Sequence, residues 1–404
     1  MSLAHTNTHP SAPATGVTAP AGFSASGVPA GLKSTGKNDV VLVQNHGPNF
    51  AAAGVFTSNR VAAAPVHWSR QVLVDSRIDA VLLNSGGANA CTGAEGFGNT
   101  HKSAEYVAEL LGVSASDVAV ASTGLIGVQL PMDKLLPGVK AAAQSLATDQ
   151  NASDQAAAGI MTTDTVPKLV SRLVGPHGSD QVTIGGMAKG AGMLAPALAT
   201  MLVVLTTDAE LSAEQADTAL RAATAMSFDR ADSDGCMSTN DTVLLLASGA
   251  SGSTPDIAEF TAALTDACCE LAAKLIEDAE GADHTIAIRT YNAATEADAL
   301  EVSKAVSRSN LVKTAVFGKD PNWGRVLSEV GTTKAAFEAD ELNVSINGVM
   351  VCKNGGVGED RNLVSLEERN VSIEIDLNAG DEEATVLTND LTHDYVHENS
   401  AYSS

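Results

Sequence analysis

The segment from Lys189 to Thr200 has the residue types needed for a nucleophile that is made by cutting the chain. It reads Lys-Gly-Ala-Gly-Met-Leu-Ala-Pro-Ala-Leu-Ala-Thr and leads into the apolar run Met201 to Leu205. A Thr hydroxyl is a weak nucleophile unless a base adjoins it, and its own α-amine becomes that base once the preceding peptide bond is cut. A strained turn with the small Ala199 would favour the N-to-O acyl shift that makes this cut. The other interpretation is that Thr200 only begins a buried strand, where β-branched residues are common.

The same segment also matches a dinucleotide-binding pattern, but only in part. Gly190 to Ala195 fits GxGxx[GA] and follows the strand-like run Val182 to Ile184. Pro196 comes directly afterwards, so the segment has no room for the helix that should hold a pyrophosphate at its N-terminus. No GxxxxGK[ST] and no GxSxG motif occurs in the chain. These features disfavour a Rossmann enzyme, a P-loop nucleotide enzyme and an α/β-hydrolase.

His393 and His397 form a pair with a spacing that could suit a metal. Four residues apart, they could place both imidazoles on one face of a helix. The residues between them are Asp-Tyr-Val instead of the HExxH pattern, and a metal site needs further ligands that are not evident nearby. We therefore expect no metal site.

The charge balance disfavours nucleic acid and anionic membranes as partners. The 404 residues carry 48 Asp and Glu against 24 Lys and Arg, which gives a net charge of −24. Such a chain is repelled by phosphate backbones. The strongest apolar run has five residues, far fewer than the roughly 20 of a spanning helix, and the first 30 residues do not resemble a secretory signal.

The cysteines favour a reducing compartment. There are five, at positions 91, 236, 268, 269 and 352, with no CxxC spacing, and the adjacent pair cannot easily bridge. We expect free thiols in a cytoplasmic protein.

Short β-branched runs alternate with alanine-rich helical stretches, which predicts an α/β protein. The expected strands cover residues 39–43, 80–83, 117–121, 182–184, 284–289, 313–317, 342–346 and 371–377. The expected helices cover residues 100–111, 133–147, 211–225 and 256–280, the first of them ending at Gly112. After the helix at 256–280, Gly281 to Asp283 interrupt the pattern and strand-like runs follow. We therefore place a soft domain boundary near residue 285. Residues 320–325 are interpreted as a structural turn with Trp323 as its anchor.

Several motifs together resemble the glutamate N-acetyltransferases, also called ornithine acetyltransferases, of arginine biosynthesis. Members of that family cleave themselves between Ala and Thr in a KGxGMxxPxxATML context, and this chain has those residues in register from Lys189 to Leu202. Further matches lie across nearly the whole chain, at residues 84–90, 122–127, 161–165, 238–242, 320–325 and 399–404.

The resemblance assigns roles to individual residues. It implies that Thr200 is the nucleophile and the new N-terminus after cleavage at Ala199, and that Thr123 and Gly124 stabilise the oxyanion. A strand that runs into a glycine turn there agrees with this role, since backbone N–H groups can converge on one oxygen. The implied substrate contacts are Thr162, Lys189, Thr200, Glu280, Asn399 and Ser404. Thr163 adjoins Thr162 and could make its contact instead.

The resemblance also implies the reaction and the architecture. The acetyl group passes from N-acetyl-L-ornithine to L-glutamate through an acetyl-Thr200 ester, with no metal or organic cofactor. Residues 1–25 would be a flexible tail, and residues 26–285 a large catalytic domain of layered mixed sheets and helices. Residues 286–404 would form a smaller α/β domain whose tail returns to the active site. The two cleaved chains would associate, as a heterotetramer with two copies of each.

Three alternatives remain at this point. The chain could be a catalytically silent binding protein that uses the same pocket, stays uncut and forms no acetyl ester. The chain could be an N-terminal-nucleophile amidase or aminopeptidase, which cleaves itself in the same way but transfers to water. It could also be bifunctional and take acetyl groups from acetyl-CoA, although no adenine or pyrophosphate loop is recognisable.

Overall fold

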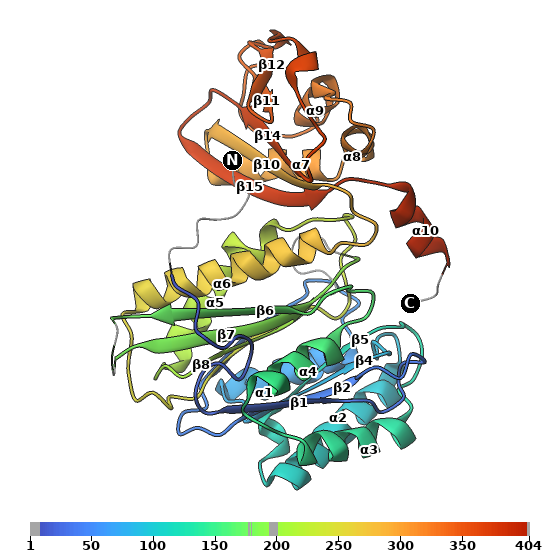
Figure 1. The fold of residues 1–404 in the computed structure, drawn as a ribbon, viewed down its shortest axis with the longest axis vertical. Coiled ribbons are helices and arrows are strands. Elements are labelled where there is room, and N and C mark those ends of the chain that lie inside the picture. The colour runs from blue at the N-terminus through green and yellow to red at the C-terminus, as the bar shows by residue number, and fades with distance from the viewer. Residues whose placement is uncertain (1–8, 177, 179, 194–200, 402–404) are drawn as a thin grey trace. The chain divides into compact units, whose positions relative to one another are not determined.

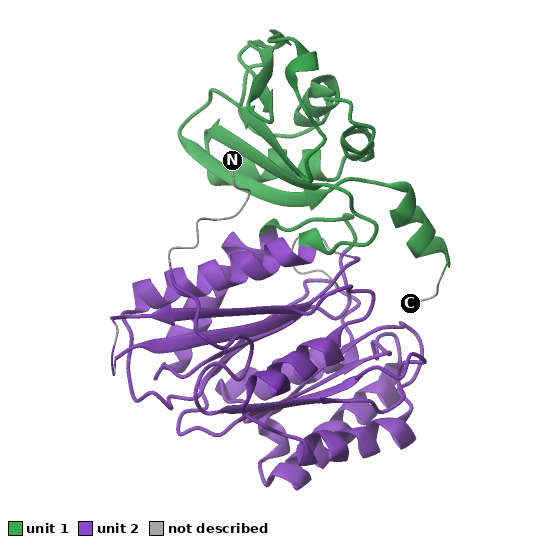
Figure 2. Cartoon of the chain, in the orientation of Figure 1, with its two compact units in different colours: residues 1–3, 230–236, 276–403 green, residues 4–229, 237–275, 404 purple. Residues whose placement is uncertain are grey.

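The computed structural model describes residues 9–176, 178, 180–193 and 201–401. The chain divides into two compact units, which Figure 2 shows in two colours. The large unit contains residues 4–229 and 237–275, and the small unit contains residues 230–236 and 276–403. Both units combine helices with strands (Figure 1), which confirms the expected α/β class.

The large unit is built on two sheets. The first has the order β1-β2-β4-β5, with strands Phe23–Val28, Val40–Asn45, Ala80–Ser85 and Val118–Thr123. The second has the order β3-β9-β8-β7-β6, with strands Ala52–Phe56, Thr242–Ala247, Leu202–Thr207, Val182–Lys189 and Lys168–Val174. The pairs β4–β5 and β8–β9 are parallel and the other pairs are antiparallel. Residues of both sheets share one hydrophobic core.

Helices pack against these sheets, and one of them, at residues 150–160, contacts strands of both sheets. These helices are α1 (Ala64–Val72), α2 (Gly93–Leu111), α3 (Met132–Gln144), α4 (Gln150–Ile160), α5 (Ala213–Met226) and α6 (Ile257–Glu277). Figure 1 shows α6 along the five-stranded sheet and α2 and α3 along the four-stranded sheet. Because both faces are covered, the middle strands β8 and β9 are buried along their whole length and read as continuous apolar runs instead of alternating ones.

The small unit has one sheet with the order β13-β12-β11-β14-β10-β15. The strands are β10 (Thr285–Ala293), β11 (Asn343–Ile346), β12 (Val349–Lys353), β13 (Gly356–Val357), β14 (Asn370–Asp376) and β15 (Glu382–Asn389). The helices are α7 (Glu296–Ser307), α8 (Asn310–Phe317), α9 (Trp323–Val330) and α10 (His393–Ala401). A separate apolar cluster, rich in Ile and Val, fills this unit. Asn322 caps α9, so the expected turn at 320–325 is the start of this helix.

Most expected elements are present, with ends that differ by a few residues. Helix α2 begins at Gly93, seven residues before the predicted start, and ends at Leu111 as predicted. Its C-cap is Gly112, which has a left-handed φ of 70° and donates its N–H to the carbonyl of Ala108. Glycine adopts this conformation without the penalty that a Cβ atom would bring.

The prediction of a strand at residues 313–317 is wrong, because this segment belongs to helix α8. Its buried residues Val312, Ala315 and Val316 recur at helical spacing, and the Ser309 hydroxyl caps the helix by accepting the N–H of Val312. The β-branched valines suggested a strand, but capping and packing on one face decided the structure.

The prediction of a flexible tail is also wrong for residues 9–25. Val17 is fully buried, and the Thr18 hydroxyl donates to the carbonyl of Asp149. Gly16 donates its N–H to the carbonyl of Val170, so this segment lies beside β6. Prolines and small residues are as compatible with a segment that packs closely on the rest of the large unit as they are with a loose tail.

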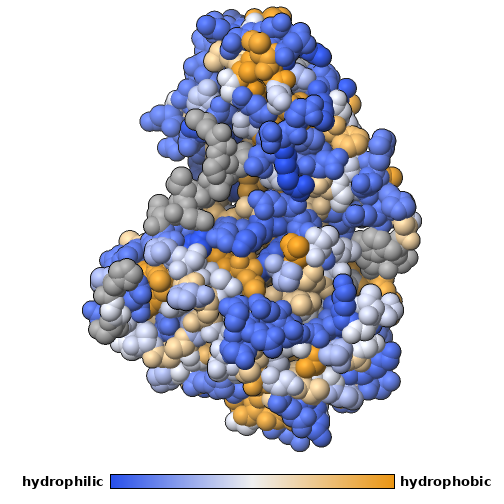
Figure 3. Space-filling view, in the orientation of Figure 1, coloured by the Kyte–Doolittle hydropathy of each residue, from blue (hydrophilic) through white to orange (hydrophobic). Residues whose placement is uncertain are grey.

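The surface is largely polar. Figure 3 shows hydrophilic side chains over most of the visible face, with apolar ones in small separate groups. Within the ranges that the structure describes, no helix is long and apolar enough to cross a membrane, and all five cysteines are free thiols. The same ranges hold no cluster of three His, Cys, Asp or Glu side chains arranged for a metal ion.

Two glycines of α2 should respond oppositely to substitution by alanine. Gly112→Ala forces a Cβ into the left-handed region and should lower the free energy of unfolding by about 1 kcal/mol. Gly98 lies inside the helix with open space around it, so Gly98→Ala should raise that free energy by up to about 1 kcal/mol. Chemical unfolding of both variants checks this, and changes of the same sign would contradict the C-cap assignment.

Candidate active site

Two glycine turns meet where the parallel strands β4 and β5 end. Gly86 and Gly87 follow β4, and each donates its backbone N–H to the carbonyl of Thr123 at 3.0 Å. Gly124 follows β5 with a φ of 126°, and a Cβ atom on it would lie 2.6 Å from the nitrogen of Gly87. Only glycine fits at position 124, because both the φ and the space exclude a side chain.

This turn fixes the direction of one backbone donor. Since a peptide unit is planar, the N–H of Gly124 points away from the carbonyl of Thr123. Two hydrogen bonds hold that carbonyl toward Gly86 and Gly87, so the Gly124 N–H points to the opposite side. A preorganised donor of this kind can stabilise a negative charge on an oxygen.

The nucleophile candidate lies on a connection between two paired strands. Strand β7 ends at Lys189 and β8 begins at Leu202, and these two residues are partners across the sheet. Ala199 and Thr200 are outside the described residues. Met201, the next residue, is held twice: its N–H donates to Asp241 Oδ1 at 3.1 Å, and its carbonyl accepts the N–H of Thr242 at 3.0 Å.

Lys189 is a buried cation beside the Thr123 turn. Only 1% of it is exposed, and its Nζ lies 3.4 Å from Thr123 Oγ1 and 3.9 Å from Asp164 Oδ2. The buried ammonium of Lys168 donates to Asp164 Oδ1 at 2.7 Å. The predicted site residues Lys189, Thr123 and Gly124 are therefore neighbours in the large unit.

Asp164 connects the groups of this cluster. Its carboxylate accepts the N–H of Gly190 at 2.7 Å and the N–H of Thr162 at 3.0 Å. Burial alone would raise the pKa of this carboxyl, but the ammonium groups of Lys189 and Lys168 outweigh burial and lower the pKa to about 2. Thr162 and Thr163 are both half-buried next to Asp164, so the backbone places either hydroxyl near the cluster.

Asp241 is a second buried carboxyl at the site. It is fully buried, and burial raises its pKa well above the usual range, against the effect of the Met201 N–H. Sequence reasoning gave no role to Asp164, Lys168 or Asp241. Lys168 begins β6 and Asp241 directly precedes β9, but the sequence alone does not show that these strands are buried or which charged groups meet there.

The remaining predicted residues belong to the small unit or lie outside the described part. Glu280 is 8% exposed, and its Oε2 accepts a hydrogen bond of 2.9 Å from Nδ2 of Asn399 on helix α10. These two residues are thus brought together within the small unit. Ser404 lies outside the described residues.

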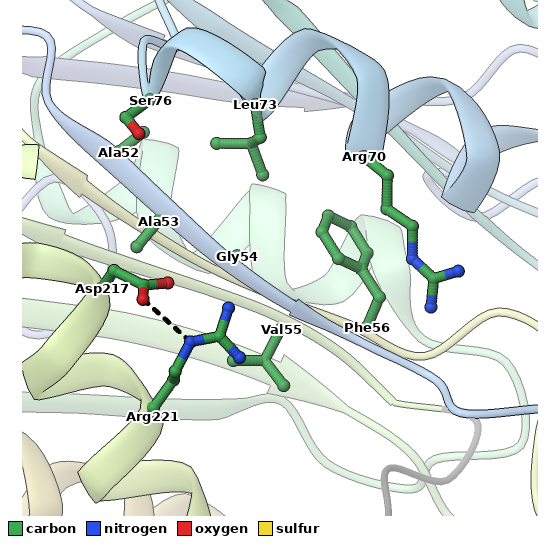
Figure 4. A pocket seen from close by; sticks show the side chains of 10 residues that line it. All are labelled: Ala52, Ala53, Gly54, Val55, Phe56, Arg70, Leu73, Ser76, Asp217 and Arg221. Carbon is green, nitrogen blue, oxygen red and sulfur yellow. Dashed lines mark hydrogen bonds and ion pairs between the residues drawn. The ribbon is translucent and has the colours of Figure 1, made fainter. Parts of the chain in front are cut away.

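A cavity of about 390 Å³ lies elsewhere in the large unit, at the outer edge of β3 (Figure 4). Residues of α1 and α5 flank it, including Arg70 and the ion pair of Arg221 with Asp217, whose atoms are 2.8 Å apart. None of the predicted site residues lines this cavity. The buried cluster around Lys189 is the better site candidate, because its charged groups lie at the start of the segment that leads from Lys189 to Thr200.

The sequence is similar to that of well-described enzymes. The model of the ArgJ family matches residues 24–404. The arginine biosynthesis bifunctional protein ArgJ of Streptomyces coelicolor is 62% identical over 390 residues, which cover 96% of this chain and 100% of that protein. That of Thermobifida fusca is 58% identical over 388 residues, with the same shares covered. A solved chain of the ornithine acetyltransferase of Mycobacterium tuberculosis, in complex with ornithine, is 56% identical. It aligns with 47% of this chain and 98% of its own, with a TM-score of 0.45.

The Asp164→Asn variant should lose a pH-dependent part of the stability. A carboxyl whose pKa falls from 3.8 to about 2 on folding stabilises the folded state by about 2 kcal/mol above pH 5. This contribution shrinks by about 1 kcal/mol between pH 5 and pH 3, because the carboxyl becomes protonated in the unfolded chain while it stays mostly ionised in the folded one. The difference in unfolding free energy between wild type and variant, measured by chemical denaturation, should shrink accordingly.

Asp208→Asn is the matched control for this measurement. Asp208 is also buried, beyond the other end of β8, but burial raises the pKa of its carboxyl. A raised folded-state pKa makes stability fall as the pH rises, so the difference for Asp208 should change with the opposite sign. Equal trends in both variants would contradict the charge assignment at Asp164.

Proposed function

Because the chain belongs to the ArgJ family of arginine-biosynthesis enzymes, we propose that it transfers an acetyl group from N-acetyl-L-ornithine to L-glutamate. The family membership confirms the resemblance to ornithine acetyltransferases that the motifs indicated. The observation that carries the proposal is the buried Lys189 ammonium, which lies 3.4 Å from Thr123 Oγ1 at the start of the segment that leads to Thr200. A buried cation beside a turn that can stabilise an oxyanion suits an N-acetyl amino acid, which has a carboxylate and an acetyl carbonyl.

We propose that Thr200 is first freed by self-cleavage after Ala199. Its hydroxyl then attacks the acetyl carbon of N-acetylornithine, while its α-amine accepts the hydroxyl proton. The backbone of Thr123 and Gly124 stabilises the oxyanion. The amide C–N bond breaks, the proton passes to the leaving nitrogen, and ornithine departs from an acetyl-Thr200 ester. The amine of L-glutamate then attacks the ester, which gives N-acetylglutamate and restores the hydroxyl.

The substrate contacts follow from charge. Lys189 would hold the α-carboxylate, and Thr162 or Thr163 would orient the amide. Glu280, with Asn399, would accept the ammonium of the ornithine side chain, and Ser404 would complete the site. The name of the relatives, "bifunctional", supports a second donor, and we propose acetyl-CoA in that role. The covalent ester stores the acetyl group, so the transfer needs no cofactor.

The processed enzyme would consist of residues 1–199 and residues 200–404. The five-stranded sheet supports lasting association, because β6 and β7 come from the first part of the chain and β8 and β9 from the second. We propose a heterotetramer with two copies of each chain, located in the cytoplasm, where free thiols persist.

An N-terminal-nucleophile amidase remains the alternative. It would use the same Thr200 and the same cleavage, but water would be the acceptor. Release of acetate at full rate without glutamate would favour the amidase. Strong dependence of turnover on glutamate would favour the transferase.

Thr200→Ala should give an uncut, inactive protein. The hydroxyl is required both for the acyl shift and for the acetyl ester, so mass spectrometry should find only the full-length 41.1 kDa chain. Thr200→Ser keeps a hydroxyl but loses the methyl group that restricts χ1. It should cut more slowly and retain part of the transfer activity. Near-normal transfer per folded protein in the Ala variant would overturn the mechanism.

The wild-type protein should carry one acetyl group on the second chain when N-acetylornithine is supplied without glutamate. Mass spectrometry should show an increase of one acetyl unit on the fragment that begins at Thr200, and glutamate should remove it. A wild-type protein that is active but remains a single full-length chain would contradict the cleavage.

A further inference from the structure

A second lysine, Lys33, lies at the same cluster as Lys189. It is half-buried, and its Nζ donates to the carbonyl of Met161 at 3.0 Å. Met161 directly precedes Thr162, whose N–H binds Asp164. This bond to the Met161 carbonyl uses one of the three N–H donors of the Lys33 ammonium. Lys33 can therefore bind an added carboxylate while it keeps this contact.

The loop that carries Lys33 is held in place by one buried carboxylate. Asp39 accepts the backbone N–H groups of Ala30 and Leu32 at 2.6 Å each and that of Lys33 at 3.0 Å. Asp39 is fully buried just before β2. Three backbone donors on one carboxylate fix the path of residues 30–33, so the position from which the Lys33 side chain extends is set before any substrate arrives.

The same loop packs on the glycine turn next to Thr123. A Cβ atom on Gly86 would lie 3.0 Å from the carbonyl carbon and oxygen of Leu32. Gly86 in turn donates its N–H to the carbonyl of Thr123. Lys33 is thus tied at its backbone to the turn that would hold the oxyanion, and at its ammonium to the segment that would contact the substrate.

The two lysines are close enough for one dicarboxylate to reach both of them. The contacts from Lys33 through Met161, Thr162 and Asp164 to Lys189 limit the distance between the two ammonium nitrogens to about 12 Å. The outer oxygens of an extended glutamate are about 7 Å apart, and an ammonium lies about 2.8 Å from the oxygen it binds. One glutamate can therefore reach both ammonium groups.

Charge also favours an added anion here. Lys33, Lys168 and Lys189 face the carboxylates of Asp39 and Asp164, which leaves one positive charge in a chain with a net charge of −24. Burial lowers the pKa of Lys33, and the cations Lys37 and Lys189 lower it further, while Asp39 and Asp164 raise it. A carboxylate between Lys33 and Lys189 would relieve the repulsion between the two cations.

We propose that Lys33 binds the side-chain carboxylate of the acceptor amino acid and so selects glutamate, while Lys189 binds the α-carboxylate of both substrates. This inference rests on the proposed transferase function. It separates the two substrates by chemistry, since N-acetylornithine has one carboxylate and a side-chain ammonium, and glutamate has two carboxylates. Lys33 is then a residue for the second half of the reaction only.

The test compares the two half-reactions in Lys33 variants. Lys33→Gln and Lys33→Met remove the charge, Lys33→Arg keeps it, and Lys37→Gln removes a charge from an exposed position four residues along the same loop. The first half-reaction is followed by ornithine release and by the acetyl mass on the Thr200 fragment. The second is followed by kcat/KM for glutamate and for glutamine, whose side chain is similar in size but uncharged.

The two neutral Lys33 variants should keep the rate of the first half-reaction within about twofold. Their kcat/KM for glutamate should fall about 10- to 100-fold, as expected for a lost hydrogen bond between charged groups, and approach the value for glutamine. Lys33→Arg should retain a preference for glutamate, and Lys37→Gln should behave like wild type. Thermal unfolding of each variant identifies any loss of folded protein.

Each other outcome counts against the inference. Equal losses in both half-reactions, or an unchanged preference for glutamate over glutamine, would overturn the role of Lys33 and leave the transferase function intact. A wild-type protein that forms no acetyl ester, or whose ester reacts with water as fast as with glutamate, would overturn the proposed function and this inference with it.

Discussion

The carboxylate of Asp164 has to be neutralised in the interior of the large unit, and the groups that do this come from three separate parts of the sequence. Lys168 begins strand β6, Lys189 ends strand β7, and Thr162 lies on the loop after α4. A buried carboxylate without such partners would cost several kcal/mol. The need to satisfy this one group therefore fixes Thr162, the Lys189 ammonium and Gly190 relative to one another.

Local patterns in the sequence predicted much of the fold. The end of α2 at Gly112 and about half of the described strands, among them β4, β5 and β10, follow from glycine stops and β-branched runs. The two failures have different physical causes. In residues 310–317, the Ser309 cap and the burial of one helical face outweighed the β-branched valines. In residues 9–25, contacts with distant segments decided the structure, as when the Gly16 N–H binds the Val170 carbonyl across more than 150 residues. A single sequence carries no information about such pairings, and it gives local propensity too much weight.

The residues of the candidate site also fall into those that local sequence motifs identify and those that only distant contacts identify. Short motifs were sufficient to single out Thr123, Gly124 and Lys189, which the structure brings together in the large unit. Asp164 and Asp241 were present in quoted motifs without a role, because a carboxylate becomes informative only when its burial and partners are known. Lys33 lies outside all of the motifs that indicated a function. Its importance comes from one carbonyl at Met161 and one packing contact at Gly86, and neither is visible along the chain.

The strand order of the five-stranded sheet also has a consequence for how the protein folds and refolds. The order β3-β9-β8-β7-β6 places β9 and β8, which follow residue 200, between β3 on one side and β7 on the other. In an uncut chain, this sheet forms within one molecule, and its assembly does not depend on protein concentration. After cleavage at residue 199, the same sheet would need two chains to meet, at a cost in translational and rotational freedom. Refolding of a cleaved molecule would therefore depend on the concentration of its two chains. The first folding of each molecule, within one chain, would be a unimolecular event that cleavage prevents from recurring.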